Sequence, residues 1–235
     1  MESKNSNGRA GKSISSVEIK KLCGMAVFVA FAVVVTLLTK WLRVAHLTFD
    51  AKDAVITIAA YIYGPLPALT MSIATSILET LTFGGDTGPY GLFMNILSTA
   101  TFSLTASIIY KKKRNINGAI LGLLSAALVT TAVMLLANIF VTPFYLGLPV
   151  FSPVIMKMIP TLILPFNLAK ALMNSALAMY LYKPALAALR GAHLVEGSAK
   201  STLSFNKNSK ISFVAGFIVI VLSATIFIVL LNLNS

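Results

Sequence analysis

The chain has 235 residues, of which 57% are hydrophobic and 11% are charged, and its formal net charge is +12 at pH 7. A soluble domain carries about 25% charged residues, so the composition excludes an ordinary soluble protein and indicates an integral membrane protein. The cations gather in the segments between apolar stretches, which argues against a nucleic-acid partner and links the charge to membrane topology.

The first predicted helix runs from about Leu22 to Leu42 and follows a polar, basic segment, residues 1–20. Its apolar stretch exceeds the 7 to 15 residues of a signal-peptide core and has no Ala-x-Ala cleavage signal, so we expect it to be retained. The second helix, about Ala54–Tyr63, ends at Gly64 and Pro65, since proline lacks the amide donor. Its ten residues reach only about 15 Å, which is too short to span without the flanking turns.

Four further helices are predicted from apolar segments. No charged residue occurs between Asp86 and Lys111 or between Asn115 and Met156, and uncharged stretches of about 18 residues or more are typical of membrane helices. Prolines between residues 143 and 160 break the pattern and predict an outer loop or interfacial segment. The expected helices are Pro67–Leu81, Leu92–Tyr110, Ile116–Phe140 and Met158–Tyr182.

The basic residues predict the topology. Fourteen of the 19 cations lie before the first helix, at residues 111–114 or after the sixth helix, and these segments share one side of the membrane if six helices are counted. Since cytoplasmic loops carry excess lysine and arginine, we expect a multi-pass cell-membrane protein with a cytoplasmic N-terminus.

The predicted fold class is an all-α integral membrane protein with a six-helix bundle and an additional C-terminal transmembrane helix. The bundle covers residues 21–184 and follows the basic cytoplasmic tail, residues 1–20. Residues 185–210 are rich in Ser, Asn, Gly and Lys, which predicts a flexible basic linker. The apolar segment 211–231 is long enough for a seventh span.

Asn167 and Lys170 are the strongest candidate site residues. A lysine within a membrane helix costs about 2.5–3.5 kcal/mol on insertion scales and is a functional-site hypothesis by default. Residues three apart share one helical face, so both side chains point the same way. Asn95 and Asn138 add amides, although single asparagines also join helices to one another. These donors have few expected acidic partners, which predicts a ligand with carbonyl acceptors.

The sequence does not support catalysis. Lys170 and Ser175 are five residues apart and lie on different helical faces, and neither histidine stands in a metal-ligand spacing. Glu79 near a helix end is more typical of a solvated or bridging carboxylate than of a ligand contact. We therefore predict no catalytic residue, metal site or resident cofactor, and keep a membrane-embedded enzyme acting on lipid as the distant alternative.

Several short motifs between about Lys21 and Pro184 resemble those of a known protein family. They are Ala26-x-x-x-Ala30, Phe49-Asp50-x-x-Asp53, Gly64-Pro65, Thr87-Gly88-Pro89-x-Gly91-x-x-x-Asn95, Asn138-x-x-x-x-Pro143-x-Tyr145, Pro165-Phe166-Asn167-x-x-Lys170 and Tyr182-Lys183. In order and helix position they resemble the substrate-binding S components of energy-coupling factor (ECF) vitamin transporters, and among these the riboflavin-binding subfamily. The segment 211–231 is not part of that six-helix unit.

The resemblance implies a substrate-binding membrane subunit that takes riboflavin from outside, with FMN acceptance left open. It assigns ring contacts to Asn138, Asn167 and Lys170, and weaker contacts near the ribityl chain to residues of the first loop. Asn95, as an amide, and Tyr145, as an aromatic wall, join them from the residues themselves. The full set of predicted ligand contacts is Thr48, Phe49, Asp50, Asn95, Asn138, Tyr145, Asn167 and Lys170. Another vitamin, such as thiamin or biotin, is the alternative within the family.

The resemblance also implies partners. In this family the small-residue motif of the first helix, here Ala26 and Ala30, docks onto a membrane coupling protein that two cytoplasmic ATPases drive. Such small residues let two helices approach closely. Packing within the bundle explains the motif equally well from the sequence.

Overall fold

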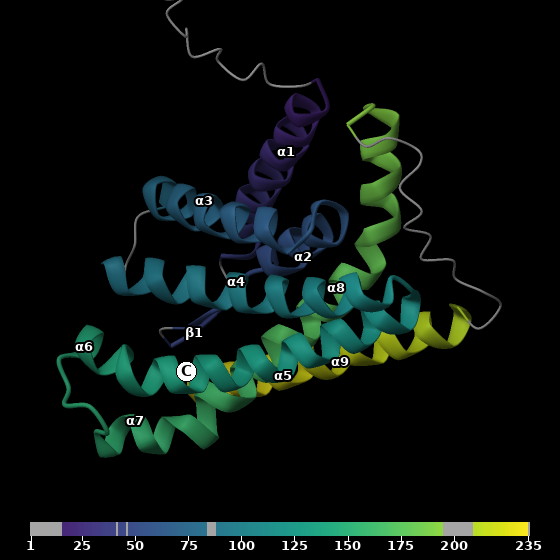
Figure 1. Ribbon diagram of the computed structural model, residues 1–235. Helices are drawn as coiled ribbons and strands as arrows, with labels where there is room; N and C mark the ends of the chain where they lie inside the picture. Colours follow the sequence, from purple (N-terminus) through teal and green to yellow (C-terminus); the bar gives the residue numbers. More distant parts are fainter. Residues whose placement is uncertain (1–15, 41, 46, 84–87, 195–208, 235) are drawn as a thin grey trace, which may run out of the picture.

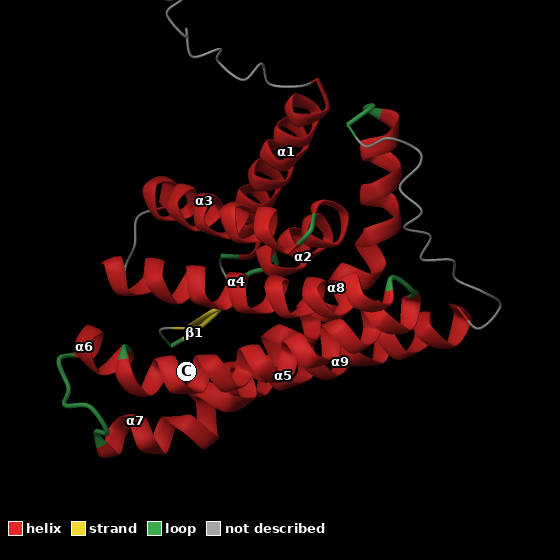
Figure 2. Cartoon of the chain, in the orientation of Figure 1, coloured by secondary structure: helices red, strands yellow, loops and turns green. Residues whose placement is uncertain are grey.

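The computed structural model describes residues 16–40, 42–45, 47–83, 88–194 and 209–234 (Figure 1). Most of the predicted basic tail, part of the predicted linker, and Thr87 of the motifs lie outside these residues. The described chain is almost entirely helical, as the red ribbon of Figure 2 shows. The fold is therefore an all-α membrane protein, as predicted.

The elements follow the predicted order along the chain. They are α1 (Ser16–Thr39), β1 (Arg43–Val44), β2 (Leu47–Thr48), α2 (Lys52–Tyr63), α3 (Pro65–Phe83), α4 (Gly88–Lys113), α5 (Ile116–Phe140), α6 (Thr142–Leu146), α7 (Pro153–Met158), the π-helix η1 (Ile159–Ile163), α8 (Leu164–Gly191) and α9 (Ser209–Asn234). Among the described residues, α1, α4, α5 and the continuous stretch Pro153–Gly191 are long and apolar enough to cross a membrane.

The first helix ends earlier than predicted. α1 stops at Thr39, and Arg43–Val44 and Leu47–Thr48 form a two-stranded antiparallel pair, here called the β1–β2 pair, in which Arg43 faces Thr48 and Val44 faces Leu47. The amide of Phe49 donates a hydrogen bond to the carbonyl of Leu42 at 2.8 Å and closes this segment. Strands of two residues are too short to give a period-2 pattern, so the sequence does not predict them.

The last predicted bundle helix is longer than expected at both ends. α7, η1 and α8 follow one another without a break, and Pro160 and Pro165 lie within this stretch. Each proline removes one i→i−4 hydrogen bond, and the π-helix is a wider turn of the kind that accommodates such interruptions. α8 also passes through Pro184 to Gly191, so the first residues of the predicted linker are helical.

Helix α1 has two different faces. Gly24, Phe28, Ala32 and Thr36 are buried at intervals of four residues, which places them on one helical face. α1 packs this face against α2 and α3. The other face is exposed and apolar, and includes Phe31, as is expected of a helix surface that meets lipid or another membrane helix.

Helices α4 and α5 pack closely along their length. At Gly122 an added Cβ would lie 2.7 Å from the carbonyl oxygen of Ala106, so only glycine permits this approach. The outer surface of α5 carries exposed leucines such as Leu128, which is 67% exposed. The α4–α5 pair thus fixes the relative positions of Asn95 on α4 and Asn138 on α5, two of the predicted site residues.

Candidate ligand-binding site

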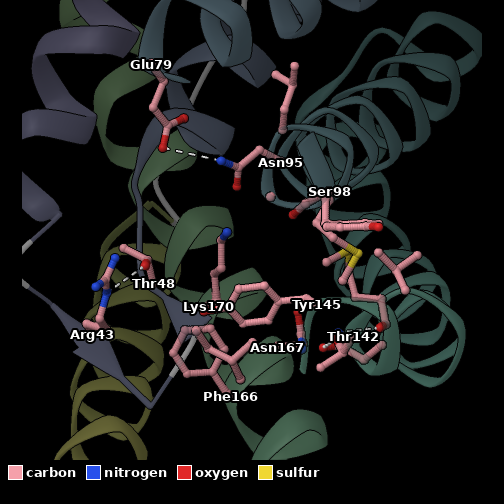
Figure 3. Close-up of a pocket in the computed structure, with 18 of the residues that line it drawn as sticks. Arg43, Thr48, Glu79, Asn95, Ser98, Thr142, Tyr145, Phe166, Asn167 and Lys170 are labelled. Atoms are coloured by element: carbon pink, nitrogen blue, oxygen red, sulfur yellow. Dashed lines mark hydrogen bonds between the residues drawn. The ribbon is translucent and has the colours of Figure 1, made fainter. Parts of the chain in front are cut away.

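A pocket opens among the ends of five helices and the β1–β2 pair, and many of its lining residues are drawn in Figure 3. It lies at the C-terminal ends of α3 and α5, the short helix α6 and the N-terminal parts of α4 and α8, and Lys40 reaches it from just beyond α1. The polar lining residues are Lys40, Arg43, Thr48, Glu79, Thr80, Asn95, Ser98, Asn138, Thr142, Asn167 and Lys170. The aromatic ones are Tyr90, Tyr145 and Phe166.

Lys170 extends from α8 towards the centre of this pocket (Figure 3). Its Nζ donates a hydrogen bond to Asp50 Oδ2 at 2.9 Å and lies 3.9 Å from Asp53 Oδ2. The prediction that the donors have few acidic partners is therefore wrong. Both carboxylates come from a segment about 120 residues away in sequence, so helical spacing around Lys170 gave no sign of them.

Asp50 lies in the loop before α2 and is buried. Burial by itself would raise the pKa of this carboxyl, but the ammonium groups of Lys170 and Lys52 outweigh burial and hold the pKa below its ordinary value. Asp50 Oδ1 is buried and accepts no hydrogen bond from the described residues. Asp50 thus depends on its two lysines for charge compensation.

Asp53, on the first turn of α2, is the second acidic neighbour of Lys170. Its Oδ1 accepts a hydrogen bond from the hydroxyl of Thr99 at 2.6 Å, and its Oδ2 accepts one from Ser98 at 3.4 Å. Ser98 also lines the pocket. Asp53 therefore links α2 to α4 behind the pocket wall and extends the charged cluster to that helix.

Glu79 bridges helices, which is one of the two roles predicted for it. It also lines the pocket. Its Oε2 accepts a hydrogen bond from the fully buried ammonium of Lys52. Its Oε1 accepts one from Asn95 Nδ2 at 3.4 Å, drawn as the dashed line between these two residues in Figure 3. Asn95 on α4 is thus held in place by a charged pair that joins α2 and α3.

Asn138 and Asn167 face the pocket from α5 and α8. One N–H of each amide is bonded to its own helix, Asn138 to the carbonyl of Met134 at 2.7 Å and Asn167 to that of Ile163 at 2.8 Å. The oxygen of Asn138 accepts from Thr142 at 2.9 Å. Since a primary amide has two N–H groups, each side chain keeps one that these bonds do not use.

Asn174 supports the site, although it is not among the residues predicted from the sequence. Its amide nitrogen donates to the carbonyl of Asp50 at 3.0 Å, and its oxygen accepts from the amide of Ala54 at 3.0 Å. Asn174 therefore caps the start of α2 from α8, a position where an unpaired N–H is costly. It lies four residues after Lys170 on the same helical face, and that spacing was the available signal.

Six of the eight predicted ligand contacts line the pocket: Thr48, Asn95, Asn138, Tyr145, Asn167 and Lys170. Phe49 and Asp50 do not belong to the lining. Phe49 is buried and packs against Phe166 and Phe227 in an apolar cluster. Phe49 directly follows the last residue of β2, and Asp50 serves as the partner of Lys170. Both residues thus lie outside the lining, and their contacts with a ligand stay a prediction.

The fold and the site place the chain in the class of α-helical membrane proteins that have a small-molecule pocket lined by polar and aromatic residues. The family "ECF transporter, substrate-specific component" matches residues 20–182, and the chain belongs to this family. It is thus a transporter component and not an enzyme, as the sequence predicted.

Two curated proteins and one solved structure are similar to the chain. "Riboflavin transporter RibU" of Staphylococcus aureus (strain TCH60) is 31% identical over 183 residues, which cover 75% of this chain and 95% of that protein. "Riboflavin transporter FmnP" of Bacillus subtilis (strain 168) is 27% identical over 158 residues, 63% of this chain and 83% of that protein. A structure described as "Structure and mechanism of the S component of a bacterial ECF transporter" superposes with a TM-score of 0.61 at 29% identity, covering 74% of this chain and 99% of that chain.

Proposed function

We propose that this chain is the substrate-binding subunit of an ECF transporter and that its ligand is riboflavin. The observation that carries the proposal is the convergence of Asn138, Asn167 and Lys170 on one pocket from α5 and α8. The names of the two similar curated proteins, both riboflavin transporters, support the same ligand.

The chemistry of the pocket suits a flavin. The pyrimidine edge of the flavin ring presents carbonyl, N–H and carbonyl groups in a row. The unused amide N–H groups and amide oxygen of the asparagines complement such an edge, and the ammonium of Lys170 can donate to a carbonyl while Asp50 balances its charge. Tyr145 and Phe166 offer apolar faces to the flat ring.

A titration of the purified chain with riboflavin tests this proposal. Bound riboflavin is expected to lose fluorescence in a saturable, one-to-one titration, because stacking on aromatic side chains quenches the ring. A second titration with FMN measures whether the pocket tolerates a terminal phosphate next to Lys40 and Arg43. Thiamin and biotin test the alternative ligands within the family, and displacement of riboflavin by either vitamin would favour that alternative.

We propose that the pocket opens outwards and that the N-terminus is cytoplasmic. The same helices carry the pocket at one end and basic residues at the other: α4 ends in Lys111, Lys112 and Lys113, and α8 has Arg190 in its last turn. The positive-inside tendency supports a cytoplasmic location for the basic ends. In this arrangement residues 21–184 form the binding unit and α9 is a further span.

We also propose that α1 docks onto the membrane coupling protein of an ECF module with two cytoplasmic ATPases. Ala26 and Ala30 are exposed, on the face of α1 that points away from buried Phe28 and Ala32. This supports docking over packing within the bundle, the second explanation of the motif. Small side chains at this spacing let another helix approach closely.

A further inference from the structure

Helix α9 contacts the binding unit although it lies beyond the residues that the family matches, which end at 182. Among its contacts are α8 and β1, and Figure 1 shows it as the yellow helix that ends beside the binding unit. Both of its neighbours supply pocket residues, Phe166 and Arg43. Helix α9, which lies outside the residues that the family matches, thus contacts two elements that line the pocket.

Phe227 makes this contact. Its ring is 6.1 Å from the ring of Phe166, measured between centroids, and 6.1 Å from that of Phe49. Phe166 lines the pocket, and Phe49 directly follows Thr48, which lines it too. Phe227 therefore supports two separate parts of the pocket wall from behind, one on α8 and one at the end of the β1–β2 pair.

The buried residues of α9 lie on one face. Phe227 and Leu230, three residues apart, belong to the apolar cluster that also contains Val44 of β1. Ile228 and Val229, which lie between them in sequence, are 56% and 49% exposed. This asymmetry means that α9 presents a defined surface to the binding unit and an apolar outer surface to the membrane.

The β1–β2 pair needs such support. Its two strands have two residues each, and isolated two-stranded pairs are at best marginally stable. On the pocket side it carries Arg43, Leu47 and Thr48, so a ligand on that side cannot be bound firmly while the pair moves. On the opposite side, Val44 and Phe49 pack in the apolar cluster to which α9 contributes Phe227 and Leu230.

We propose that α9 is a built-in brace of the ligand pocket and that Phe227 is its positioning residue. Phe227 does not touch the ligand; it fixes Phe166 and the β1–β2 pair in the positions that line the site. The effect on ligand retention rests on the proposed binding of riboflavin, whereas the ordering of the β1–β2 pair does not depend on the identity of the ligand.

The test compares three single variants of the full chain, Phe227→Ala, Phe227→Leu and the control Ile228→Ala, which shortens a neighbouring exposed side chain of the same helix. The first readout is amide hydrogen exchange of the β1–β2 pair without ligand. We expect faster exchange in Phe227→Ala, an intermediate rate in Phe227→Leu, and the wild-type rate in Ile228→Ala. Phe227→Leu serves alone if the alanine variant fails to fold.

The second readout is riboflavin dissociation, followed by the return of its fluorescence. We expect a rate at least about fivefold higher in Phe227→Ala, since changes around a site act mainly on dissociation, and an unchanged rate in Ile228→Ala. Wild-type exchange and dissociation rates in both Phe227 variants would overturn the brace, as would equal effects of Ile228→Ala. If wild-type protein fails to bind riboflavin, the proposed ligand is wrong, and the hydrogen-exchange comparison still decides the brace.

Discussion

Lys170 Nζ and Asp50 Oδ2 are 2.9 Å apart, and this ion pair joins the middle of the pocket to the loop that precedes α2. Lys52 lies 3.8 Å from the same carboxylate oxygen, so the loop is held between two ammonium groups. The pair explains how a lysine is tolerated in a membrane helix. It also orients the ammonium, which reaches the pocket from a fixed position.

Replacing Lys170 by methionine is expected to lower both stability and riboflavin affinity. The buried Asp50 carboxylate loses its closest partner, and breaking a buried ion pair costs about 3–5 kcal/mol. The double variant Asp50→Asn, Lys170→Met should regain part of the thermal stability, since the Asp50 carboxylate is removed with its partner and Asp53 keeps its hydrogen bonds from Ser98 and Thr99. It should not regain affinity, since the ligand still lacks its donor. Recovery of affinity in the double variant would show that Lys170 is a structural residue only.

Asn167 and Asn174 lie on the same helix and are expected to differ in role. Asn167→Ala should weaken riboflavin binding about tenfold, which corresponds to about 1.4 kcal/mol, with little change in melting temperature. Asn174→Ala should instead destabilise the protein by about 1–2 kcal/mol, because it removes the cap of α2. Thermal unfolding and ligand titration of both variants separate the two effects, and equal stability losses would contradict this division.

Gly122 is expected to be irreplaceable at the contact of α4 with α5. Gly122→Ala would place a Cβ 2.7 Å from the carbonyl oxygen of Ala106 and should cost about 1–3 kcal/mol by overpacking. Gly191→Ala is the matched control, because an added Cβ there meets no atom within 4 Å. Comparing the melting temperatures of the two variants measures the contact. A control variant as unstable as Gly122→Ala would refute the explanation.

The sequence predicted the helices and the site best where the signals are local. Uncharged stretches ended by prolines, glycines or basic runs located the helices, and the spacing of Asn167 and Lys170 placed both on the pocket face. The partners Asp50 and Asp53 were missed because they come from another part of the chain, and folding alone brings them to Lys170. The contact of Phe227 with Phe166 and Phe49 joins three distant segments for the same reason.

Ala26 and Ala30 are expected to matter for coupled transport and not for ligand binding. Replacing either by tryptophan should abolish ATP-dependent riboflavin uptake in cells that contain the complete transporter, because a large side chain prevents close approach of a partner helix. Ligand affinity of the purified variant should stay at the wild-type value, since both residues lie on the exposed face of α1. Leu128→Trp on the exposed face of α5 is the control. Loss of ligand binding on replacing Ala26 or Ala30 by tryptophan would mean that the motif packs within the bundle.

The proposed ligand is tested most directly by offering the purified protein an equimolar mixture of riboflavin, thiamin and biotin in equilibrium dialysis. Mass spectrometry of the retained fraction then identifies the bound vitamin, a dialysis cell without protein gives the background, and Asn167→Ala is measured at the same concentrations. We predict that riboflavin is retained in a one-to-one ratio and that Asn167→Ala retains much less. Retention of thiamin or biotin in place of riboflavin, or of none of the three, would contradict the account.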